Sequence, residues 1–390
     1  MERFINMTGF RNKVKNNKPK VELQSITTLV AGTYKAGKTR LWKEVTELHY
    51  LTPDDVLLMA FEDGYETWEI DNIVPLHKEG TDDTLWKVWE FFKKSVVPDL
   101  VKEAKEGRIT KLIGTDTADR AIDACTAWIL YDRGKKYAKT FVSLQDISDN
   151  TKENGWTVLY EELKKPFDTL KNAGYGLFHL AWAKEKETTL YDGMKYNSIQ
   201  LMMNNTGRKV FESQASLICC LHNETSVLDK HGNELEENLT DKKNREKASN
   251  FHETKTMMYF RPSDYIEIAG GRFTNLPEKV EYGAETFLNV FEEAVKGQLK
   301  KTTQTVAELK KEEQEEREEK VKEMTDKLEN DPDEVLSQID EIVSSMEQKQ
   351  KVEASVEFEK AFKVKNYKQE KGNLENLKIA LDIVTKIISK

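Results

Sequence analysis

Cysteine is scarce in this sequence of 390 residues, which contains only Cys125, Cys219 and Cys220. No pair has the CxxC spacing, and adjacent cysteines rarely bridge each other. The sequence therefore disfavours both a disulfide framework and a thiolate zinc site. Cys219 and Cys220 fall on a buried-strand pattern instead, and the nearby His222 and His231 match no standard metal-ligand spacing.

Long apolar runs are also missing. No stretch approaches the ~18–20 residues needed to span a bilayer, and residues 1–5 lack the apolar run of a signal peptide. The sequence also contains no internal repeat and no proline-rich or glycine/serine-rich linker. We therefore expect no membrane partner and a reducing, cytoplasmic compartment.

Charge is abundant but unevenly placed. Charged residues make up 33% of the chain and hydrophobic residues 38%, and the net charge is −9. Residues 308–347 alone contain 16 acidic and 6 basic residues, so the rest of the chain is close to neutral. This distribution predicts a core joined to a charge-rich segment, and it leaves room for a local basic groove.

Strand-like and helix-like segments alternate from residue 21 onward. This alternation predicts parallel βαβ units and an α/β core. An Asp192-Gly193 pair between two β-rich runs predicts a hairpin. The predicted strands are residues 25–31, 56–61, 109–116, 176–182 and 215–221, with closing strands at 257–260 and 265–268. The predicted core helices are residues 41–51, 85–106, 121–131, 156–172 and 285–299.

The domain plan follows from changes in composition. Residues 1–20 contain six basic residues and one acidic residue, which predicts a basic N-terminal arm. Residues 21–299 form the predicted core, and residues 300–330 form a charged helical linker. Apolar faces at residues 335–346 and 374–388 need cover, so residues 331–390 are predicted to form a small helical module.

The clearest motif is a full GxxxxGK[ST] match between a predicted strand and a predicted helix. Its glycines let the backbone curl into an anion nest, and the helix turns its positive end toward that nest. The lysine can neutralise the β- and γ-phosphates, and the final hydroxyl can hold Mg²⁺. The motif predicts binding of ATP or GTP. Its residues are Gly32, Thr33, Tyr34, Lys35, Ala36, Gly37, Lys38 and Thr39.

Two acids are candidates to complete this site. Asp116 ends a predicted strand and suits the magnesium-binding Walker B role, so Thr39 and Asp116 are the predicted metal residues. Its alternative role is to cap the next helix. Glu62 ends another predicted strand and is the candidate general base, with Lys38 and Asp116 as the other catalytic candidates. Its alternative is a solvated strand-end acid, and Asp63 and Glu66 are neighbouring rivals.

The order of motifs resembles phage-encoded RecA-like ATPases, often labelled phage nucleotide-binding proteins, a group that includes single-strand annealing recombinases. The resemblance covers roughly residues 21–299. The matching residues are the loop 32–39, Phe61-Glu62-Asp63-Gly64, Asp116-Thr117, Asn154-Gly155-Trp156, Gly174-Tyr175-Gly176, Lys184-Glu185-Lys186 and residues 270–277.

This resemblance implies a RecA-like P-loop NTPase core with a mainly parallel sheet, extended here by C-terminal helices. It also implies ATP with Mg²⁺, and action on single-stranded DNA in phage recombination or replication within the infected host cell. The family pattern usually has a polar residue, often histidine, where the strand before Lys184 ends. Here that position is Trp182, with His179 three residues earlier. We therefore expect that no polar sensor at this position couples the phosphate to the DNA loop, and that hydrolysis is slow or is coupled in another way.

In RecA-like folds the loops after the strands face the DNA, and residues 183–209 occupy such a position. Their basic residues can follow phosphates while aromatic rings stack on bases. The surplus of positive charge is only +2, and an ordinary exposed hairpin is the alternative. The candidate DNA-binding residues are Lys184, Lys186, Tyr191, Lys195, Tyr196, Arg208 and Lys209.

Arg272 follows two glycines near the end of the core and is a candidate arginine finger reaching a neighbour's γ-phosphate, with Arg261 as a rival. A finger of this kind predicts a homo-oligomer. The alternative for Arg272 is a surface residue of a turn.

A rival to the DNA function is a nucleotide-switched adaptor or loader, in which the acidic helical tail binds a replication or single-strand-binding protein. A nucleotide kinase fits less well, because no arginine-rich lid is evident.

Overall fold

The structure is a computed structural model that describes residues 18–189, 192–229, 248–299, 305–330, 332–363, 366–370 and 373–388. The chain divides into two compact units, one ending at Glu315 and the other beginning at Glu316. Within the described ranges, no helix combines the length and the apolar character needed to cross a lipid bilayer.

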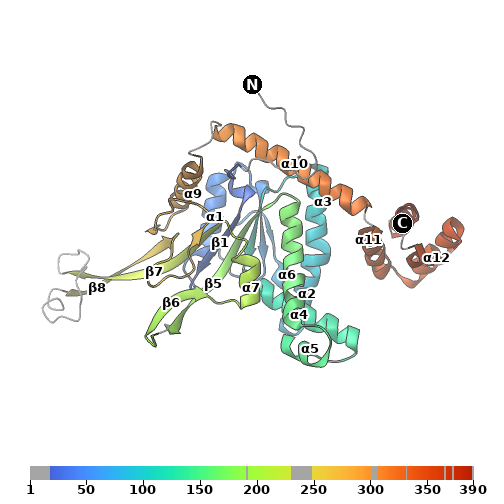
Figure 1. The fold of residues 1–390 in the computed structure, drawn as a ribbon, viewed down its shortest axis with the longest axis horizontal. Helices are drawn as coiled ribbons and strands as arrows, with labels where there is room; N and C mark the ends of the chain where they lie inside the picture. The colour runs from blue at the N-terminus through green and yellow to red at the C-terminus, as the bar shows by residue number, and fades with distance from the viewer. Residues whose placement is uncertain are drawn as a thin grey trace, which may run out of the picture. The chain divides into compact units, whose positions relative to one another are not determined.

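A mostly parallel sheet organises the first unit (Figure 1). In the described residues its strand order is β10-β8-β7-β1-β5-β4-β2-β3, with β6 paired to β5 and β9 paired to β7. The strands from β7 to β3 run parallel, so their carboxyl ends lie along one edge. The strands are β1 (Thr27–Gly32), β2 (Val56–Ala60), β3 (Ile73–Val74), β4 (Leu112–Asp116), β5 (Gly176–Thr189), β6 (Lys195–Leu201), β7 (Leu217–Asp229), β8 (Ala248–Tyr259), β9 (Gly270–Gly271) and β10 (Lys279–Glu281).

Helices cover both faces of this sheet. On one face Phe178 of β5 packs against Trp42 of α1 and Phe287 of α9. The next residue along β5, His179, lies on the other face against Phe167 of α6. β1 and β4 are buried throughout, as expected for central strands of a covered parallel sheet. The helices of this unit are α1 (Lys38–His49), α2 (Trp86–Phe91), α3 (Val97–Gly107), α4 (Ala118–Tyr137), α5 (Leu144–Asn150), α6 (Gly155–Asn172), α7 (Asn205–Phe211) and α9 (Ala284–Gln298).

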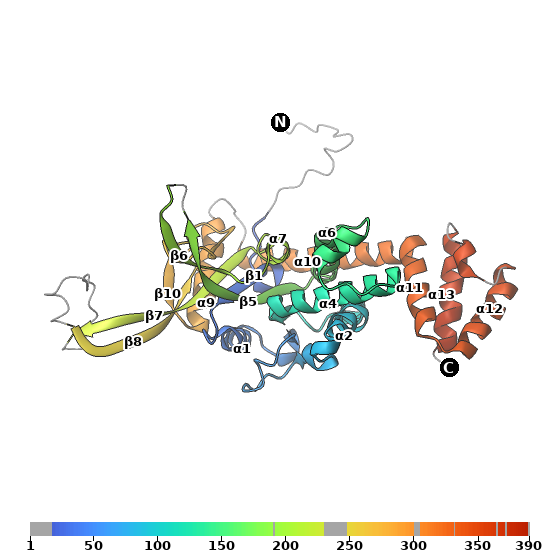
Figure 2. The ribbon, with the colours of Figure 1, turned by 90° about the horizontal axis from the view of Figure 1, so that it is seen from below.

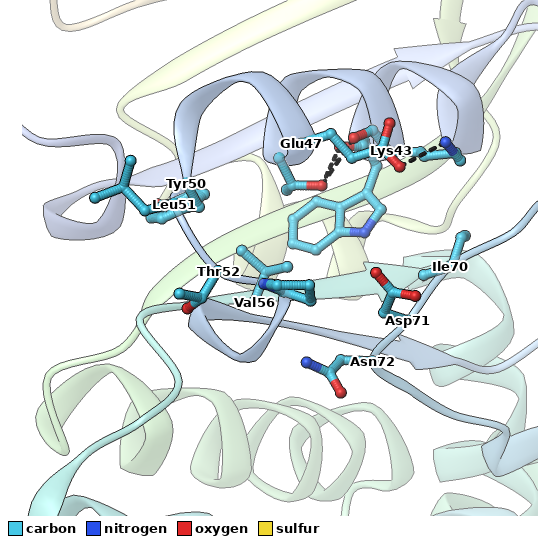
Figure 3. A pocket seen from close by; sticks show the side chains of 12 residues that line it. Lys43, Glu47, Tyr50, Leu51, Thr52, Val56, Ile70, Asp71 and Asn72 are labelled. Atoms are coloured by element: carbon cyan, nitrogen blue, oxygen red, sulfur yellow. Dashed lines mark hydrogen bonds and ion pairs between the residues drawn. The ribbon is translucent and has the colours of Figure 1, made fainter.

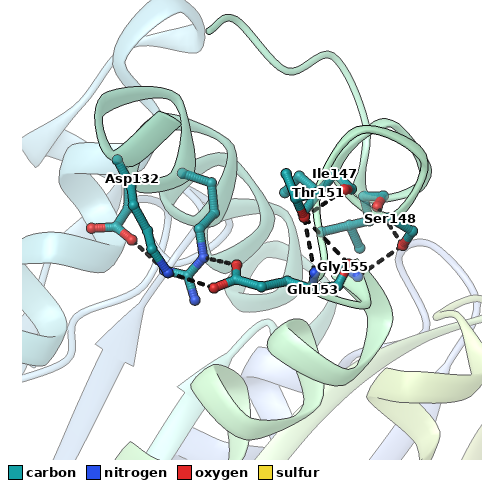
Figure 4. A network of polar contacts seen from close by, with 9 residues as sticks. Asp132, Ile147, Ser148, Thr151, Glu153 and Gly155 are labelled. Atoms are coloured by element: carbon teal, nitrogen blue, oxygen red, sulfur yellow. Dashed lines mark hydrogen bonds and ion pairs between the residues drawn. The ribbon is translucent and has the colours of Figure 1, made fainter. Parts of the chain in front are cut away.

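The Asn154-Gly155 pair of the sequence motif sets the start of α6. The Asn154 side chain accepts a hydrogen bond from a backbone N–H of the first turn. A Cβ at Gly155 would lie 2.1 Å from the Leu144 carbonyl oxygen, so the close approach requires glycine. Glu153 pairs with Arg133 of α4 at 2.5 Å (Figure 4). This motif therefore serves the junction of α4, α5 and α6.

Two antiparallel hairpins continue from the carboxyl edge of the sheet (Figure 2). β5 leaves the sheet after Trp182 and pairs with β6 from Ala183 to Thr189. The predicted Asp192-Gly193 turn is present, with Gly193 at φ 85°. β7 and β8 form the second and longer hairpin, whose pairing starts at Cys220 opposite Tyr259 and continues past Leu221, the last β7 residue paired to β1.

Sequence patterns gave the main elements but not all of them. The predicted α/β class with a mostly parallel sheet and C-terminal helices is confirmed. The strand predicted at residues 265–268 is wrong, because only an isolated bridge between Ile199 and Ile266 forms there. Cys219 and Cys220 are fully buried in β7, which confirms the predicted strand.

The charge-rich helix α10 (Val306–Asn330) begins as part of the core unit. Glu313 is only 4% exposed. Its carboxylate accepts hydrogen bonds from the Val21 backbone N–H at 2.5 Å and from the Ser25 hydroxyl. Lys18 pairs with the neighbouring Glu312 at 2.6 Å. The first part of α10 therefore fixes the segment that leads into β1.

The second unit is built from α11 (Pro332–Ser345), α12 (Gln348–Phe362) and α13 (Leu374–Ile388). Ile339 of α11, Phe358 of α12 and Leu377 of α13 share one buried apolar cluster. The apolar faces predicted at residues 335–346 and 374–388 therefore do pack together. Sequence patterns do not predict α12, because this helix contributes few apolar residues to the cluster.

Candidate nucleotide-binding site

The loop between β1 and α1 has the curled backbone expected of an anion nest. Lys35 and Gly37 adopt left-handed conformations, with φ 61° and 90°. α1 starts at Lys38, so the unpaired N–H groups of its first turn lie at the end of the loop. The predicted order of strand, loop and helix is thus confirmed. A Cβ at Gly37 would lie 3.3 Å from the Tyr282 ring, a second reason for glycine there.

Lys38 lies buried across this loop. Its ammonium donates hydrogen bonds to the carbonyl oxygens of Gly32 and Thr33, both at 3.1 Å. Burial lowers the pKa of Lys38, and the carboxylate of Asp116 opposes that effect. A cation held this way in the concavity of the loop is suited to bind phosphate oxygens.

Thr39 and Asp116 are joined although 77 residues separate them in the sequence. The Thr39 hydroxyl donates a hydrogen bond of 2.7 Å to Asp116 Oδ2. Burial raises the pKa of Asp116 to about 6. The alternative role for Asp116, capping α4, does not match this arrangement, since α4 has no side-chain cap and its N-cap residue is Thr117.

The same pair fits a magnesium ion. Asp116 Oδ1 is buried and has no hydrogen-bond partner among the described residues. An unsatisfied buried carboxylate oxygen beside a hydroxyl oxygen is the donor set that a hard divalent cation prefers. Thr39 and Asp116 would hold Mg²⁺ directly or through its water molecules.

Glu62 lies beside Asp116 because their strands are neighbours. β2 and β4 pair so that Ala60 is opposite Asp116, and the backbone N–H of Glu62 donates to the Asp116 carbonyl oxygen at 3.2 Å. The Thr117 hydroxyl donates to Glu62 Oε2 at 3.3 Å. Burial, reinforced by the Asp116 carboxylate, raises the pKa of Glu62 to about 7. A half-buried carboxylate with such a pKa suits a general base at neutral pH.

Trp182 is the last residue of β5 that pairs with β1, and it lies between the phosphate loop and Asp116. Asp119 of α4 accepts a hydrogen bond of 2.7 Å from the Trp182 backbone N–H. Burial raises the pKa of Asp119 to about 6. The Trp182 ring lies 5.4 Å from the ring of Tyr34 in the phosphate loop. His179 is fully buried, and desolvation lowers its pKa to about 3, so it is a neutral core residue at pH 7.

Arg120 and Tyr282 line the same cleft, although sequence patterns did not single them out. The Arg120 guanidinium lies 5.5 Å above the Trp182 ring. Tyr282 packs under Gly37, and its hydroxyl is 3.4 Å from the Gly37 carbonyl oxygen. With the phosphate loop and Glu62, these side chains enclose a cleft of about 640 Å³. That volume is within the range of small-ligand sites.

A second pocket lies along the later turns of α1, beside β2 and the segment before β3 (Figure 3). It has a volume of about 250 Å³, and its wall includes Trp42, Tyr50 and Asn72. Lys43 and Glu47 form an ion pair of 2.5 Å at its rim. It contains none of the predicted site residues.

The candidate DNA-binding residues lie on and next to the β5–β6 hairpin, but acids pair with several of them. Lys195 is 2.7 Å from Glu187. Arg208 binds Glu212 at 2.5 Å, and the Tyr196 hydroxyl donates to Glu267 at 3.0 Å. Lys184, Lys186 and Lys209 are exposed. Tyr191 lies outside the described residues.

Arg272 lies at the opposite edge of the sheet from the phosphate loop. Its backbone N–H bonds to Ser216, which in turn bonds to Thr27 at the amino end of β1. Its guanidinium donates to the Ser213 carbonyl oxygen at 3.1 Å. Arg272 therefore cannot serve the site of its own subunit, and a role in a neighbouring copy stays a prediction.

Comparison with known families gives one finding. A family model described as an AAA domain matches residues 24–267, more than half of the chain. The match includes the phosphate loop, Glu62, Asp116 and both hairpins, and it ends before Tyr282 and α9. A search of curated proteins finds no match.

Proposed function

The chain belongs to the AAA-domain family, and from this premise we propose that it binds ATP with Mg²⁺ in the cleft above β1 and hydrolyses it. The observation that carries the proposal is the bond between Thr39 and Asp116, which joins the phosphate loop to a buried acid beside Glu62. A loop, a metal-binding acid and a base in one cleft are the parts that phosphoryl transfer to water requires.

Each residue then has a defined task. The amides of the loop and the Lys38 ammonium bind the β- and γ-phosphates and offset charge in the transition state. Mg²⁺, held by Thr39 and Asp116, would supply further neutralisation of phosphate charge. Glu62 orients a water molecule and accepts its proton as the water oxygen bonds to the γ-phosphorus. The bond from that phosphorus to the β–γ bridging oxygen breaks, and ADP and inorganic phosphate leave.

Hydrolysis of ATP by the purified chain with Mg²⁺ tests this proposal, with Lys38→Ala as the paired variant. We expect turnover for the wild type and a loss of about 10³-fold in the variant, since Lys38 meets the transferring phosphate. GTP is run in parallel, because the phosphate loop does not select the base. If wild type and variant hydrolyse both nucleotides at the same background rate, the proposal is wrong.

We further propose that the chain is a RecA-like ATPase of the phage type that acts on single-stranded DNA. Two features support this: the β5–β6 and β7–β8 hairpins start at the same sheet edge as the nucleotide cleft, and Lys184 and Lys186 are exposed on the first of them. Filter binding of labelled single strands over a salt series tests it, since phosphate contacts make affinity fall with salt. Absence of binding at low salt, with or without ATP, would rule it out.

A specific observation favours the second candidate, an adaptor switched by nucleotide. Acids pair with Lys195 on the β5–β6 hairpin and with Arg208 on the following helix α7, so these two candidate DNA-binding cations are already engaged. The helical unit, in turn, exposes Val352 and Val356 one turn apart on α12. Nucleotide-dependent capture of a replication protein that is lost in Val352→Ser/Val356→Ser, without DNA binding, would favour this function.

A further inference from the structure

Around Lys38, the nearby carboxylates outnumber the one buried ammonium. Three carboxylates, those of Glu62, Asp116 and Asp119, act on the single buried ammonium of Lys38. ATP would add further negative charge. Such a site needs another cation near Glu62 to stabilise the transferring phosphate, because the γ-phosphoryl group carries the developing charge.

Arg120 is placed to provide it. It belongs to the first turn of α4, four residues after Asp116, and it lines the cleft together with Lys38 and Glu62. Its positive charge lowers the pKa of Glu62, against the larger upward effect of burial. The other basic residue beyond the loop, Arg40, is engaged elsewhere, with Glu44 at 2.6 Å and the Tyr282 ring at 5.3 Å.

The Arg120 side chain packs on a neighbouring ring, but its ion pair with Asp123 is weak and exposed. Its guanidinium lies over Trp182, whose ring contacts Tyr34 of the phosphate loop and whose backbone is held by Asp119. Its ion pair with Asp123 is long, at 3.4 Å, and about half of each side chain is exposed. Exposed pairs of this kind contribute little, so ATP phosphates would compete easily for the guanidinium.

We propose that Arg120 is a catalytic residue that contacts the γ-phosphate of the ATP bound to its own subunit, with Trp182 as its platform. This inference rests on the proposed ATPase function. It assigns to the same chain the cation that an arginine finger supplies from a neighbour in other ATPases. It also assigns a role to Trp182 of β5, whose ring supports the Arg120 guanidinium.

The test compares Arg120→Ala, Arg120→Lys and Asp123→Ala with the wild type. We expect Arg120→Ala to lower kcat about 10³-fold while Kd for a fluorescent ADP analogue stays within about threefold, because the guanidinium acts on transition-state charge. Arg120→Lys should recover part of the loss. Asp123→Ala removes the same surface ion pair but leaves the guanidinium, so it should keep full activity.

Two further measurements separate the possible outcomes. Retention of ADP with aluminium fluoride, a mimic of the transition state, should be lost in Arg120→Ala alone.

Co-expressed Arg120→Ala and Lys38→Ala chains should stay inactive if Arg120 serves its own subunit, whereas recovery of activity would assign Arg120 to a neighbouring subunit and overturn the proposal. Undiminished kcat in Arg120→Ala would also overturn it while wild-type hydrolysis stands. No hydrolysis by the wild type would instead refute the ATPase function and this inference with it.

Discussion

The nucleotide cleft and the β5–β6 hairpin lie at the same edge of the sheet but differ in how far their charged side chains are exposed to water. In the cleft, Glu62, Asp116 and Asp119 are largely withdrawn from water, and burial raises the pKa of each. On the β5–β6 hairpin, Lys195 and Glu187 are exposed, with side chains 61% and 56% accessible. A buried charge is coupled to its neighbours and costly to change, whereas an exposed one is screened by water and salt. Substitutions in the cleft should therefore have large effects, and those on the hairpin small ones.

The largest contrast is expected for Asp116→Asn. Hydrolysis should fall by about 10³-fold, since the amide no longer supplies an anionic oxygen for Mg²⁺. The fold should become more stable at pH 7, by about 1–3 kcal/mol, because the folded chain no longer pays for a buried ionised carboxylate. Thermal unfolding and ATPase assays of the same samples measure both effects.

The sign of the stability change follows from the raised pKa. A carboxyl whose pKa is higher in the folded state binds more protons there, so the wild type loses stability as pH rises from about 4 to about 6. The gain in Asp116→Asn should therefore be absent near pH 3.5 and complete near pH 7. Asp82→Asn, a change at an exposed acid outside the cleft, is the control. A lower melting temperature for Asp116→Asn at pH 7 would contradict this account.

The next effect concerns the pH dependence of hydrolysis. Glu62 must be ionised to accept a proton, and its pKa of about 7 predicts a rate that rises with pH and levels off above it. At pH 6 the rate should be about tenfold below the plateau, since about a tenth of the base is ionised. In Glu62→Gln the plateau should fall by about 10²-fold and the rise should disappear.

Stopped assays of kcat between pH 5.5 and 9 measure this profile. Glu66→Gln, an exposed acid in the same loop, should retain the wild-type curve. A Glu62→Gln variant with an unchanged profile would mean that another group governs the pH dependence.

The smallest effects are expected on the hairpin. Lys184→Ala or Lys186→Ala should weaken single-strand binding only a few-fold and reduce the log–log salt slope by about 0.7, as for the loss of one phosphate contact. Lys195→Ala removes the same charge, but its ammonium is already paired with Glu187. An equal loss of single-strand affinity in all three variants would mean that overall charge, rather than direct phosphate contact, determines binding.

The parts of the site that were predictable are those encoded locally. The phosphate loop is a contiguous motif, and Glu62 and Asp116 each end an apolar run that reads as a strand. The motif roles predicted that these residues share one site, but not the strand order that brings them together, in which β5 lies between β1 and β4 and β2 lies beside β4. Sequence patterns give strands and helices but not the order of strands in a sheet.

Arg120 and Tyr282 were missed for related reasons, whereas Trp182 was noticed only as a departure from the family pattern. Tyr282 contacts Gly37 across 245 residues of sequence, and no local signal marks such a contact. In the sequence, Arg120 resembles any exposed charge on a helix. Its role becomes visible only in the fold, where Trp182 of β5 lies beside it. A cue was present, since an arginine and two acids, Asp116 and Asp119, cluster where the strand gives way to the helix.

The buried bond between Glu313 and the backbone of Val21 has a practical consequence for anyone trimming this protein. The composition change near residue 299 invites a truncation there, yet a fragment ending at that point would strip the Val21 amide and the Ser25 hydroxyl of their acceptor. The segment that leads into β1, and with it the phosphate loop that follows β1, would lose this contact. A fragment that ends after Glu315 keeps the hydrogen bonds from Val21 and Ser25 to Glu313.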